Sequence, residues 1–282
     1  MEHTGLVLEG GGMRGLYTAG VLDFFLEQEL HFPYVIGVSM GACNAASYIS
    51  RQRGRNKRIV IDHINNPRYI SYRNLLMTRS LFGMDYIFNQ VPNRLDPFDY
   101  PAFYAQRQRY VVGATDCDTG QPVYFENCAE ILTALQASSS LPFIAKIVDL
   151  EGRKLLDGGI SDPIPVKKAM LDGNTKNVII LTRNAGYRKQ PFRAKWLGKL
   201  FYAKYPKLVD MLMNRHRVYN ETLAHIEKLQ AEGSVFVICP RRPIQVERIE
   251  KDQQKLAELY TQGYEDAKQS WGELQAWLRL NP

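Results

Sequence analysis

Histidine and cysteine are scarce in this chain of 282 residues, which narrows the chemistry that it can support. The five histidines are scattered along the sequence. The four cysteines lack the paired spacing of a metal site or a disulfide framework: Cys43, Cys117, Cys128 and Cys239. We therefore expect reduced thiols of the kind found inside cells and no bound metal.

Long apolar runs are missing as well. No stretch approaches the roughly 20 apolar residues that cross a bilayer. Met1-Glu2-His3-Thr4 leads directly into an apolar segment, which leaves no room for a secretory signal peptide. Internal repeats and low-complexity tracts are absent, and 45% hydrophobic with 23% charged residues is typical of a globular protein with a large core. We expect a cytoplasmic protein.

The net charge of +7 is concentrated in two segments. Residues 51–58 hold five basic residues and no acid, and residues 183–207 hold eight basic residues and no acid. The second segment also carries aromatic residues: Tyr187, Phe192, Trp196, Phe201, Tyr202 and Tyr205. Such a mixture favours peripheral contact with an anionic membrane surface. It also suits single-stranded nucleic acid, but no nucleic-acid-binding motif accompanies it, and we expect no such partner. The third interpretation is a solvated loop whose rings pack on the core.

The chain opens with two strand–turn–helix units. An apolar strand at residues 5–9 ends in a run of glycines, and a helix with one apolar face follows from Leu16. A second strand at residues 34–36 ends at Ser39, and residues 40–49 form the next helix. This βαβα order predicts an α/β fold with a mainly parallel sheet.

The remaining segments extend that pattern. We expect an irregular aromatic insert at residues 60–108, and then strands at 109–114, 122–125, 144–150, 154–156, 178–181 and 235–239. Helices are expected at 129–140, 166–171 and about 206–231, with a long one at the C-terminus. We divide the chain into a catalytic domain at residues 1–175 and a mostly helical extension at residues 176–282, packed on that domain.

The pentapeptide Gly37-Val38-Ser39-Met40-Gly41 has the form G-x-S-x-G. In many hydrolases this motif sets a serine on a tight strand-to-helix turn, with small residues where larger ones would clash. The hydroxyl then lies at a helix N-terminus, which favours developing negative charge. The pentapeptide is short enough to arise by chance, so its context decides its meaning.

The glycine run Gly10-Gly11-Gly12-Met13-Arg14-Gly15 fits two functions and one purely structural turn. The spacing G-x-G-x-x-G after a strand matches a dinucleotide-binding loop, which needs an acidic residue at the end of the second strand. The second strand ends in Ile36-Gly37-Val38-Ser39 without an acid, which disfavours that interpretation. The other function is an oxyanion hole, in which unhindered backbone N–H groups converge on a developing negative charge.

A serine nucleophile needs a base, and Asp157-Gly158-Gly159 at a strand end supplies a candidate. Asp-Gly is also common in ordinary β-turns. In the Ser…Asp…His order of α/β-hydrolases, only His216 or His225 could complete a triad. Both lie in a polar, basic helical pattern typical of a solvated helix face, which leaves Asp157 as the best candidate base.

These three motifs, in this order, resemble those of the patatin-like phospholipase family over roughly residues 5–172. Two weaker blocks of the same kind lie between them, at residues 115–120 and 137–142. The resemblance implies a three-layer α/β/α fold, hydrolysis of lipid acyl esters, and no metal or other cofactor. It also implies a dyad of Ser39 as nucleophile and Asp157 as base, with residues 10–15 as the oxyanion hole.

In the implied reaction, Ser39 attacks an ester carbonyl while Asp157 takes its proton, and water later releases the acyl group. The N–H groups of Gly11, Gly12 and Met13 hold the oxyanion, at about 3 kcal/mol per donor. Arg14 either reinforces the oxyanion side or pairs with an acid. Two alternatives stay open: a Ser-His-Asp esterase that uses His216 or His225, and a non-catalytic lipid- or nucleotide-binding protein.

Overall fold

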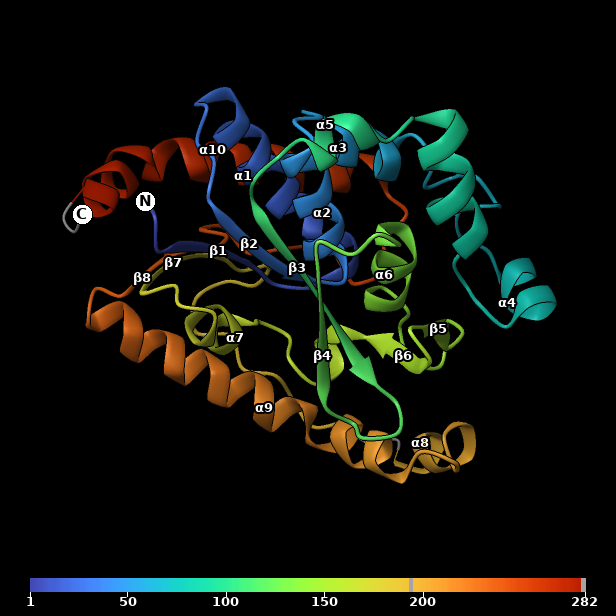
Figure 1. Cartoon of the computed structure of the whole chain (residues 1–282). Helices are drawn as coiled ribbons and strands as arrows, with labels where there is room; N and C mark the ends of the chain where they lie inside the picture. Colours follow the sequence, from blue (N-terminus) through green and yellow to red (C-terminus); the bar gives the residue numbers. More distant parts are fainter. Residues whose placement is uncertain (193–194, 280–282) are drawn as a thin grey trace.

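A mixed β-sheet runs through the middle of the computed structural model, which describes residues 1–192 and 195–279 (Figure 1). Within those ranges the sheet has eight strands, hydrogen-bonded in the succession β5-β6-β3-β2-β1-β7-β8, with β2 and β6 on one edge of β3 and β4 on the other. The strands are β1 (Thr4–Leu8), β2 (Tyr34–Val38), β3 (Arg109–Asp116), β4 (Pro122–Glu126), β5 (Val148–Leu150), β6 (Arg153–Asp157), β7 (Lys176–Ile180) and β8 (Val235–Ile238). The run from β3 to β8 is parallel, and β4, β5 and β6 are antiparallel.

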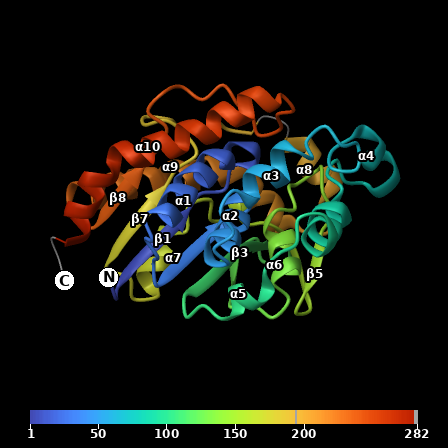
Figure 2. The ribbon, with the colours of Figure 1, turned by 90° about the horizontal axis from the view of Figure 1, so that it is seen from above.

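Helices cover both faces of the sheet (Figures 1 and 2). The α-helices are α1 (Gly15–Glu27), α2 (Met40–Ile49), α3 (Arg55–Ile61), α4 (Tyr72–Thr78), α5 (Tyr100–Tyr104), α6 (Ile131–Ser138), α7 (Val166–Leu171), α8 (Lys195–Phe201), α9 (Pro206–Ala231) and α10 (Gln253–Arg279). Two 3₁₀ turns, η1 (Gly12–Arg14) and η3 (Gly158–Ile160), follow β1 and β6, and η2 (Tyr86–Leu95) is a π-helix. None of the helices in the described ranges is both long and apolar enough to cross a bilayer.

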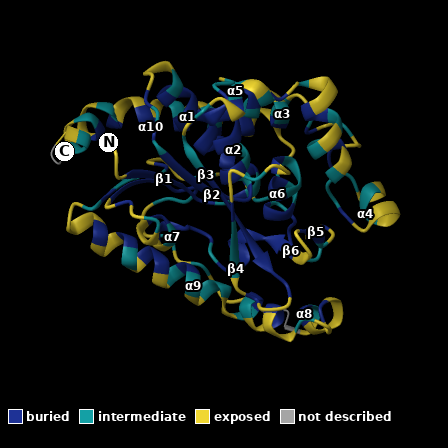
Figure 3. Cartoon of the chain, in the orientation of Figure 1, coloured by how far each residue is buried: buried dark blue, intermediate teal, exposed yellow. Residues whose placement is uncertain are grey.

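Successive side chains of the central strands point to opposite faces of the sheet, so the core has one layer on each face. Leu6 and Leu8 of β1 belong to the cluster that packs with α1, α2, α6 and α10. Val7 belongs to the cluster beneath α7 and α9. The central strands are accordingly buried, whereas the outer helix faces and α4 are exposed (Figure 3). The three-layer α/β/α architecture with a C-terminal helical region is confirmed.

The longest helix of the C-terminal region, α10, packs along α1 (Figure 2). The two backbones meet at reciprocal glycines: a Cβ at Gly263 would overlap the Tyr17 carbonyl oxygen, and one at Gly20 would overlap that of Tyr260. Tyr17 donates a hydrogen bond from its hydroxyl to Asp266 across the same contact. Because β7 and β8 also lie in the central sheet, the division at residue 175 stays a prediction.

Most expected elements are present within a few residues, with one clear difference. The strand expected at 144–150 is reduced to β5, at Val148–Leu150. Phe143 adopts a positive φ of 71°, and the Ile144 carbonyl accepts a hydrogen bond from the Leu81 N–H. The chain therefore turns toward the aromatic insert before it enters the sheet.

Candidate active site

Ser39 lies on a strained turn between β2 and α2. Its backbone has φ 55° and ψ −131°, which a residue with a side chain adopts at a cost of roughly 1–3 kcal/mol. The flanking glycines are needed because a Cβ at Gly37 would lie 2.7 Å from the Ala42 nitrogen, and one at Gly41 would lie 2.6 Å from the Leu8 carbonyl oxygen. The close packing of β1, β2 and α2 holds the turn.

A buried serine from α6 supports this turn. The Ser39 N–H donates to the Ser138 hydroxyl at 2.7 Å, and that hydroxyl donates to the Gly113 carbonyl of β3 at 2.6 Å. Two residues further on, the Ser140 carbonyl accepts from the Asp157 N–H at 2.9 Å. The family-like block at residues 137–142 therefore links the backbone of Ser39 to that of Asp157.

One edge of β3 brings Ser39 and Asp157 together. Val38 pairs with Gly113, and the next residue of β3, Ala114, pairs with Asp157. Because β4 also pairs with Ala114, β6 must use the opposite edge of β3, the one that β2 occupies up to Gly113. The end of β2 and the end of β6 therefore meet on that edge, 119 positions apart in sequence.

Asp157 is 2% exposed, and only one of its two carboxylate oxygens accepts a hydrogen bond. Oδ1 accepts from the Gly159 N–H at 2.8 Å, whereas Oδ2 has no hydrogen-bond partner in the part of the chain that the structure describes. The Thr115 hydroxyl donates to the Asp157 carbonyl at 2.9 Å. A buried carboxylate oxygen without a donor is costly, and Ser39 lines the same cavity as Asp157.

The glycine loop is held by a carbonyl from the C-terminal region. Gly12 has φ 58°, and a Cβ there would lie 2.5 Å from the Arg248 carbonyl oxygen. That oxygen also accepts from the Met13 N–H at 3.1 Å, and the Gly10 N–H points to the Pro163 carbonyl at 3.4 Å. The N–H groups of Gly11 and Gly12 donate to no described residue. They remain the candidate oxyanion donors, and the Met13 N–H is engaged.

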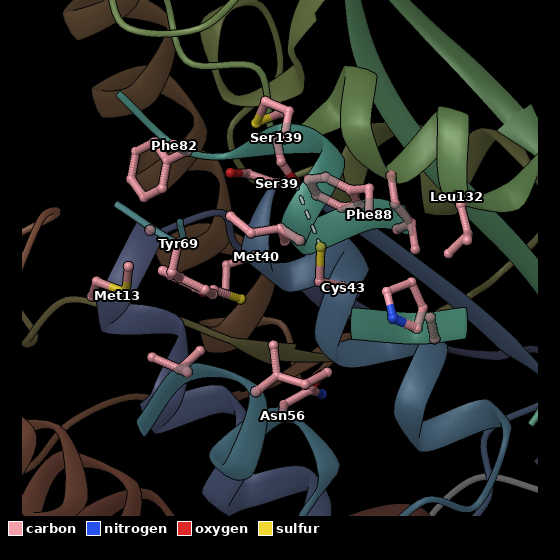
Figure 4. A pocket seen from close by; sticks show the side chains of 18 of the residues that line it. Met13, Ser39, Met40, Cys43, Asn56, Tyr69, Phe82, Phe88, Leu132 and Ser139 are labelled. Atoms are coloured by element: carbon pink, nitrogen blue, oxygen red, sulfur yellow. Dashed lines mark hydrogen bonds between the residues drawn. The ribbon is translucent and has the colours of Figure 1, made fainter. Parts of the chain in front are cut away.

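An apolar cavity opens on one side of Ser39. The side chains that line it are drawn in Figure 4, with Ser39 and Ser139 at one end of the group and Asn56 at the other. Its walls include Met13, Met40 and aromatic rings of the 60–108 insert: Tyr69, Phe82, Phe88 and Phe98. Cys43 also lines it, and burial raises the pKa of its thiol to about 11. Long apolar groups fit such a cavity.

A second, smaller cavity on the other side of Ser39 is lined by five basic residues, and we call it the cationic hollow: Arg14, Arg183, Lys189, Arg215 and Arg248. Asp157, Glu9 and the glycines at 10–12 line it as well. The Glu9 carboxylate is engaged, since it accepts from the Thr182 N–H at 2.5 Å and the Tyr219 hydroxyl at 2.7 Å. Arg215 donates to the Gly159 carbonyl at 2.5 Å, next to Asp157.

Burial lowers the pKa of three basic groups in the hollow: Arg14, Lys189 and Arg215. Burial and the charges of neighbouring guanidinium groups together lower the pKa of Arg14 and of Arg215 to about 10. Burial and the charges of Arg215 and Arg248 lower the pKa of Lys189 to about 7. No acid lies within 4.0 Å of the Arg14 guanidinium as an ion pair among the described residues, and Arg14 adds positive charge beside the glycine loop.

The structure gathers the sequence-predicted residues at one place. Ser39, Asp157, Gly159, Arg14 and the glycines at 10–12 line the cationic hollow, and Met13 and Met40 line the apolar cavity. Four others pack behind the turns: Gly15 against Met40, Gly37 and Gly41 around Ser39, and Gly158 against the Gly113 carbonyl. Val38 is buried at the end of β2.

The two candidate histidines line neither cavity. His216 is half-buried, and its Nδ1 lies 3.0 Å from the Met213 carbonyl of its own helix. Across the described residues, no group of three His, Cys, Asp or Glu side chains is arranged to hold a metal ion.

Four residues of the hollow were missed as site residues: Arg183, Lys189, Arg215 and Arg248. The helical spacing could have identified Arg215, because it lies between Leu212 and Tyr219 on the inward-facing side of α9. Within the basic-aromatic segment, the described side chains have mixed environments. Tyr202 is buried, whereas Trp196 is 65% exposed and Phe201 57% exposed; Arg193 lies outside the described residues.

Comparison with known proteins gives two matches to family models. Residues 6–170 match the model described as patatin-like phospholipase, and residues 205–279 match one described as a domain of unknown function (DUF6363). YjjU of Escherichia coli K12, an uncharacterized protein, is 30% identical over 249 residues, which cover 85% of this chain and 69% of YjjU.

More distant relatives match as well. The uncharacterized NTE family protein Rv1063c of Mycobacterium tuberculosis is 26% identical over 210 residues, which cover 69% of this chain and 54% of that protein. The chain thus spans about half the length of this relative. The crystal structure of VipD from Legionella pneumophila aligns over 97% of this chain and 67% of VipD, with a TM-score of 0.48 and 13% identity.

Proposed function

This chain belongs to the patatin-like phospholipase family, and on that premise we propose that it is a serine acyl hydrolase that cleaves carboxylic esters of lipids or phospholipids. The observation that carries the proposal is the meeting of Ser39 and Asp157 on one edge of β3, between an apolar cavity and a polar one. A strained serine beside a buried carboxylate with one free oxygen has the parts of a nucleophile and its base.

The reaction follows from these parts. Ser39 Oγ attacks the ester carbonyl, and Asp157 accepts the serine proton through Oδ2. The N–H groups of Gly11 and Gly12 hold the oxyanion of the tetrahedral intermediate, which collapses as the alcohol leaves with a proton from Asp157. Water, deprotonated by the same carboxylate, then attacks the acyl group, and Asp157 returns the proton to Ser39 Oγ as the fatty acid is released.

The proposal is tested with an activated ester and a covalent label. We expect the wild type to hydrolyse p-nitrophenyl butyrate and to be labelled by a fluorophosphonate at Ser39. Ser39→Ala abolishes both, and Asp157→Asn lowers kcat at least 100-fold because the amide cannot accept the proton. His216→Gln and His225→Gln serve as controls and retain activity. Full activity in Ser39→Ala or Asp157→Asn contradicts the dyad, and loss in a histidine variant favours the Ser-His-Asp alternative.

We further propose that the protein is cytoplasmic and contacts membranes at their surface through α8. Trp196, Leu200 and Phe201 are exposed on that helix, together with Lys199, and such rings favour the lipid interface. Trp196→Ser with Phe201→Ser should reduce cosedimentation with phosphatidylglycerol-containing vesicles at least fivefold. The exposed pair Tyr72→Ser with Met77→Ser on α4 is the control, and equal cosedimentation of both variants with the wild type contradicts the proposal.

A further inference from the structure

We infer that the cationic hollow binds the phosphate group of the substrate, so that the enzyme prefers anionic phosphate-bearing glycerolipids over zwitterionic ones. The inference rests on the proposed function, since it assigns a second part of the same active site. It is carried by the charge balance of the hollow, by a buried unpaired guanidinium, and by the position of Ser39 between two cavities.

The charges of the hollow do not balance. Five basic side chains face two carboxylates, Glu9 and Asp157. No ion pair within 4.0 Å involves any of these five among the described residues. Each oxygen of Glu9 already accepts one hydrogen bond, from a hydroxyl or a backbone N–H. Like charges gathered in a partly desolvated cavity repel one another, and an anion of charge −1 or −2 relieves that repulsion.

Arg14 gives the strongest indication that the hollow binds an anion. Arg14 as a whole residue is 4% exposed, and its Nε lacks a hydrogen-bond partner within the described part of the chain. Its charged neighbours are Arg183, Arg248 and Glu9. A guanidinium buried without a partner is strongly unfavourable unless an anion completes its hydrogen bonds. Guanidinium groups bind phosphate oxygens in a bidentate manner, which suits this ligand.

Two aromatic rings set the basic groups in place before any ligand arrives. The Arg183 guanidinium lies 4.6 Å from the centre of the Tyr187 ring, and the Lys189 ammonium lies 4.7 Å from that of Tyr219. Both rings line the hollow themselves. Side chains that are already ordered lose little entropy on binding, so the geometry favours a specific anion site over a diffuse basic surface.

The position of Ser39 explains why the phosphate belongs to the substrate. Gly12, Ser39 and Leu141 line both cavities, so the two meet at the nucleophile. A glycerolipid whose ester lies at Ser39 can extend its acyl chain into the apolar cavity and its phosphate into the hollow. A choline or ethanolamine head group adds a positive charge that the guanidinium groups of the hollow repel, which is the basis of the predicted selectivity.

The test compares two substrates with the same acyl chain. We expect kcat/KM for 1-oleoyl-lysophosphatidate to exceed that for 1-oleoyl-lysophosphatidylcholine at least tenfold in neutral detergent micelles. The double variant Arg183→Gln with Lys189→Met should lower this ratio at least tenfold. The matched control is Arg188→Gln with Lys228→Met, which removes two exposed charges that pair with Glu227 and Glu232 outside the hollow. Thermal unfolding checks that the variants fold.

Inorganic phosphate and p-nitrophenyl butyrate separate the possible failures. If neither this neutral ester nor any lipid is hydrolysed, the proposed function fails. Phosphate binding to Ser39→Ala by calorimetry still tests the hollow in that case. If the ester is cleaved but the two lipids react equally, or the double variant keeps the wild-type ratio, the inference is overturned. If phosphate binds at millimolar concentration but the enzyme shows no lipid selectivity, the hollow is a site for free phosphate, and its assignment to the substrate is overturned.

Discussion

At the scale of single residues, the site depends on backbone conformations that few side chains tolerate. Ser39 has a positive φ although it carries a side chain, and Gly12 also has one, with a carbonyl where a Cβ would lie. The strain at Ser39 is balanced by packing on all sides. The conformation of Gly12 instead depends on the position of Arg248, a single contact that a small substitution can disturb.

Gly12→Ala tests that contact. The added methyl meets the Arg248 carbonyl at 2.5 Å, so the loop must shift and the oxyanion donors with it. We expect kcat to fall at least 100-fold, measured with p-nitrophenyl butyrate. Gly152→Ala is the matched control, because Gly152 has φ 72° and nothing lies within 4 Å of its Cβ. It carries a similar backbone strain of about 1 kcal/mol, and its kcat should stay at the wild-type value.

Lys189 should make anion binding depend on pH. Its pKa is lowered to about 7, so the ammonium is charged below pH 7 and neutral above it. The groups that face it are Glu9, Arg14, Arg215, His216, Tyr219 and Arg248. Arg14 and Arg215, with pKa values of about 10, stay charged throughout.

Sulfate is a suitable ligand for this test because its charge does not change between pH 6 and 9. Its affinity for Ser39→Ala should fall severalfold as the pH rises through 7. Lys189→Met should flatten the profile, whereas His216→Gln should leave it unchanged. A pH profile that persists in Lys189→Met assigns the titration to another group and contradicts this prediction.

At the scale of elements, α6 joins the two halves of the site. Its Ser138 hydroxyl bridges the Ser39 N–H and β3, and the chain just after α6 holds the Asp157 N–H. The nucleophile and the base are thus positioned by a third segment that contributes no reacting group.

Ser138→Ala should loosen the turn at Ser39. The Ser39 N–H loses its acceptor while buried, which costs about 1–3 kcal/mol of folding free energy. We expect that loss in urea unfolding, together with slower fluorophosphonate labelling of Ser39. Ser50→Ala is the comparison: Ser50 is also buried and bonds the Ser47 carbonyl at the end of α2. If Ser39 is labelled at the wild-type rate in Ser138→Ala, Ser138 does not position the nucleophile.

The positions of helices and strands can be predicted from the sequence more reliably than the grouping of distant side chains in one site. Ser39, Asp157 and the glycine loop belong to motifs with local signatures, and the resemblance of the three, in their order, to the patatin-like family implies their roles. The cationic hollow has no such signature, since Arg14, Arg215 and Arg248 come from η1, α9 and the segment before α10. Their meeting depends on how α9 and the C-terminal segment return to the carboxyl ends of the parallel strands, which periodicity does not reveal.

At the scale of the whole molecule, the N-terminal and C-terminal parts of the chain are packed as one unit. α1 and α10 meet at Gly20 and Gly263 without room for a side chain, and β7 and β8 extend the sheet beside β1. The face of α10 that packs inward buries Leu256, Ala267 and Leu274.

Gly263→Ala measures the importance of this helix contact. The methyl would overlap the Tyr17 carbonyl, so α1 and α10 must separate, and we expect a loss of about 1–3 kcal/mol in urea unfolding. Gly272→Ala, in the same helix with nothing within 4 Å, should instead stabilise by about 0.5–1 kcal/mol through helix propensity. Equal effects of the two substitutions contradict the close approach.

The Arg248 carbonyl has a consequence for how such chains can diverge. It lies within the region that matches the domain of unknown function, yet it completes a loop in the region that matches the patatin-like model. A protein that has the patatin-like region without the C-terminal one must find another acceptor for its equivalent of the Met13 N–H. In this chain the two regions are therefore constrained to evolve together, and exchanging either one between relatives should transfer function only when residue 248 keeps its place.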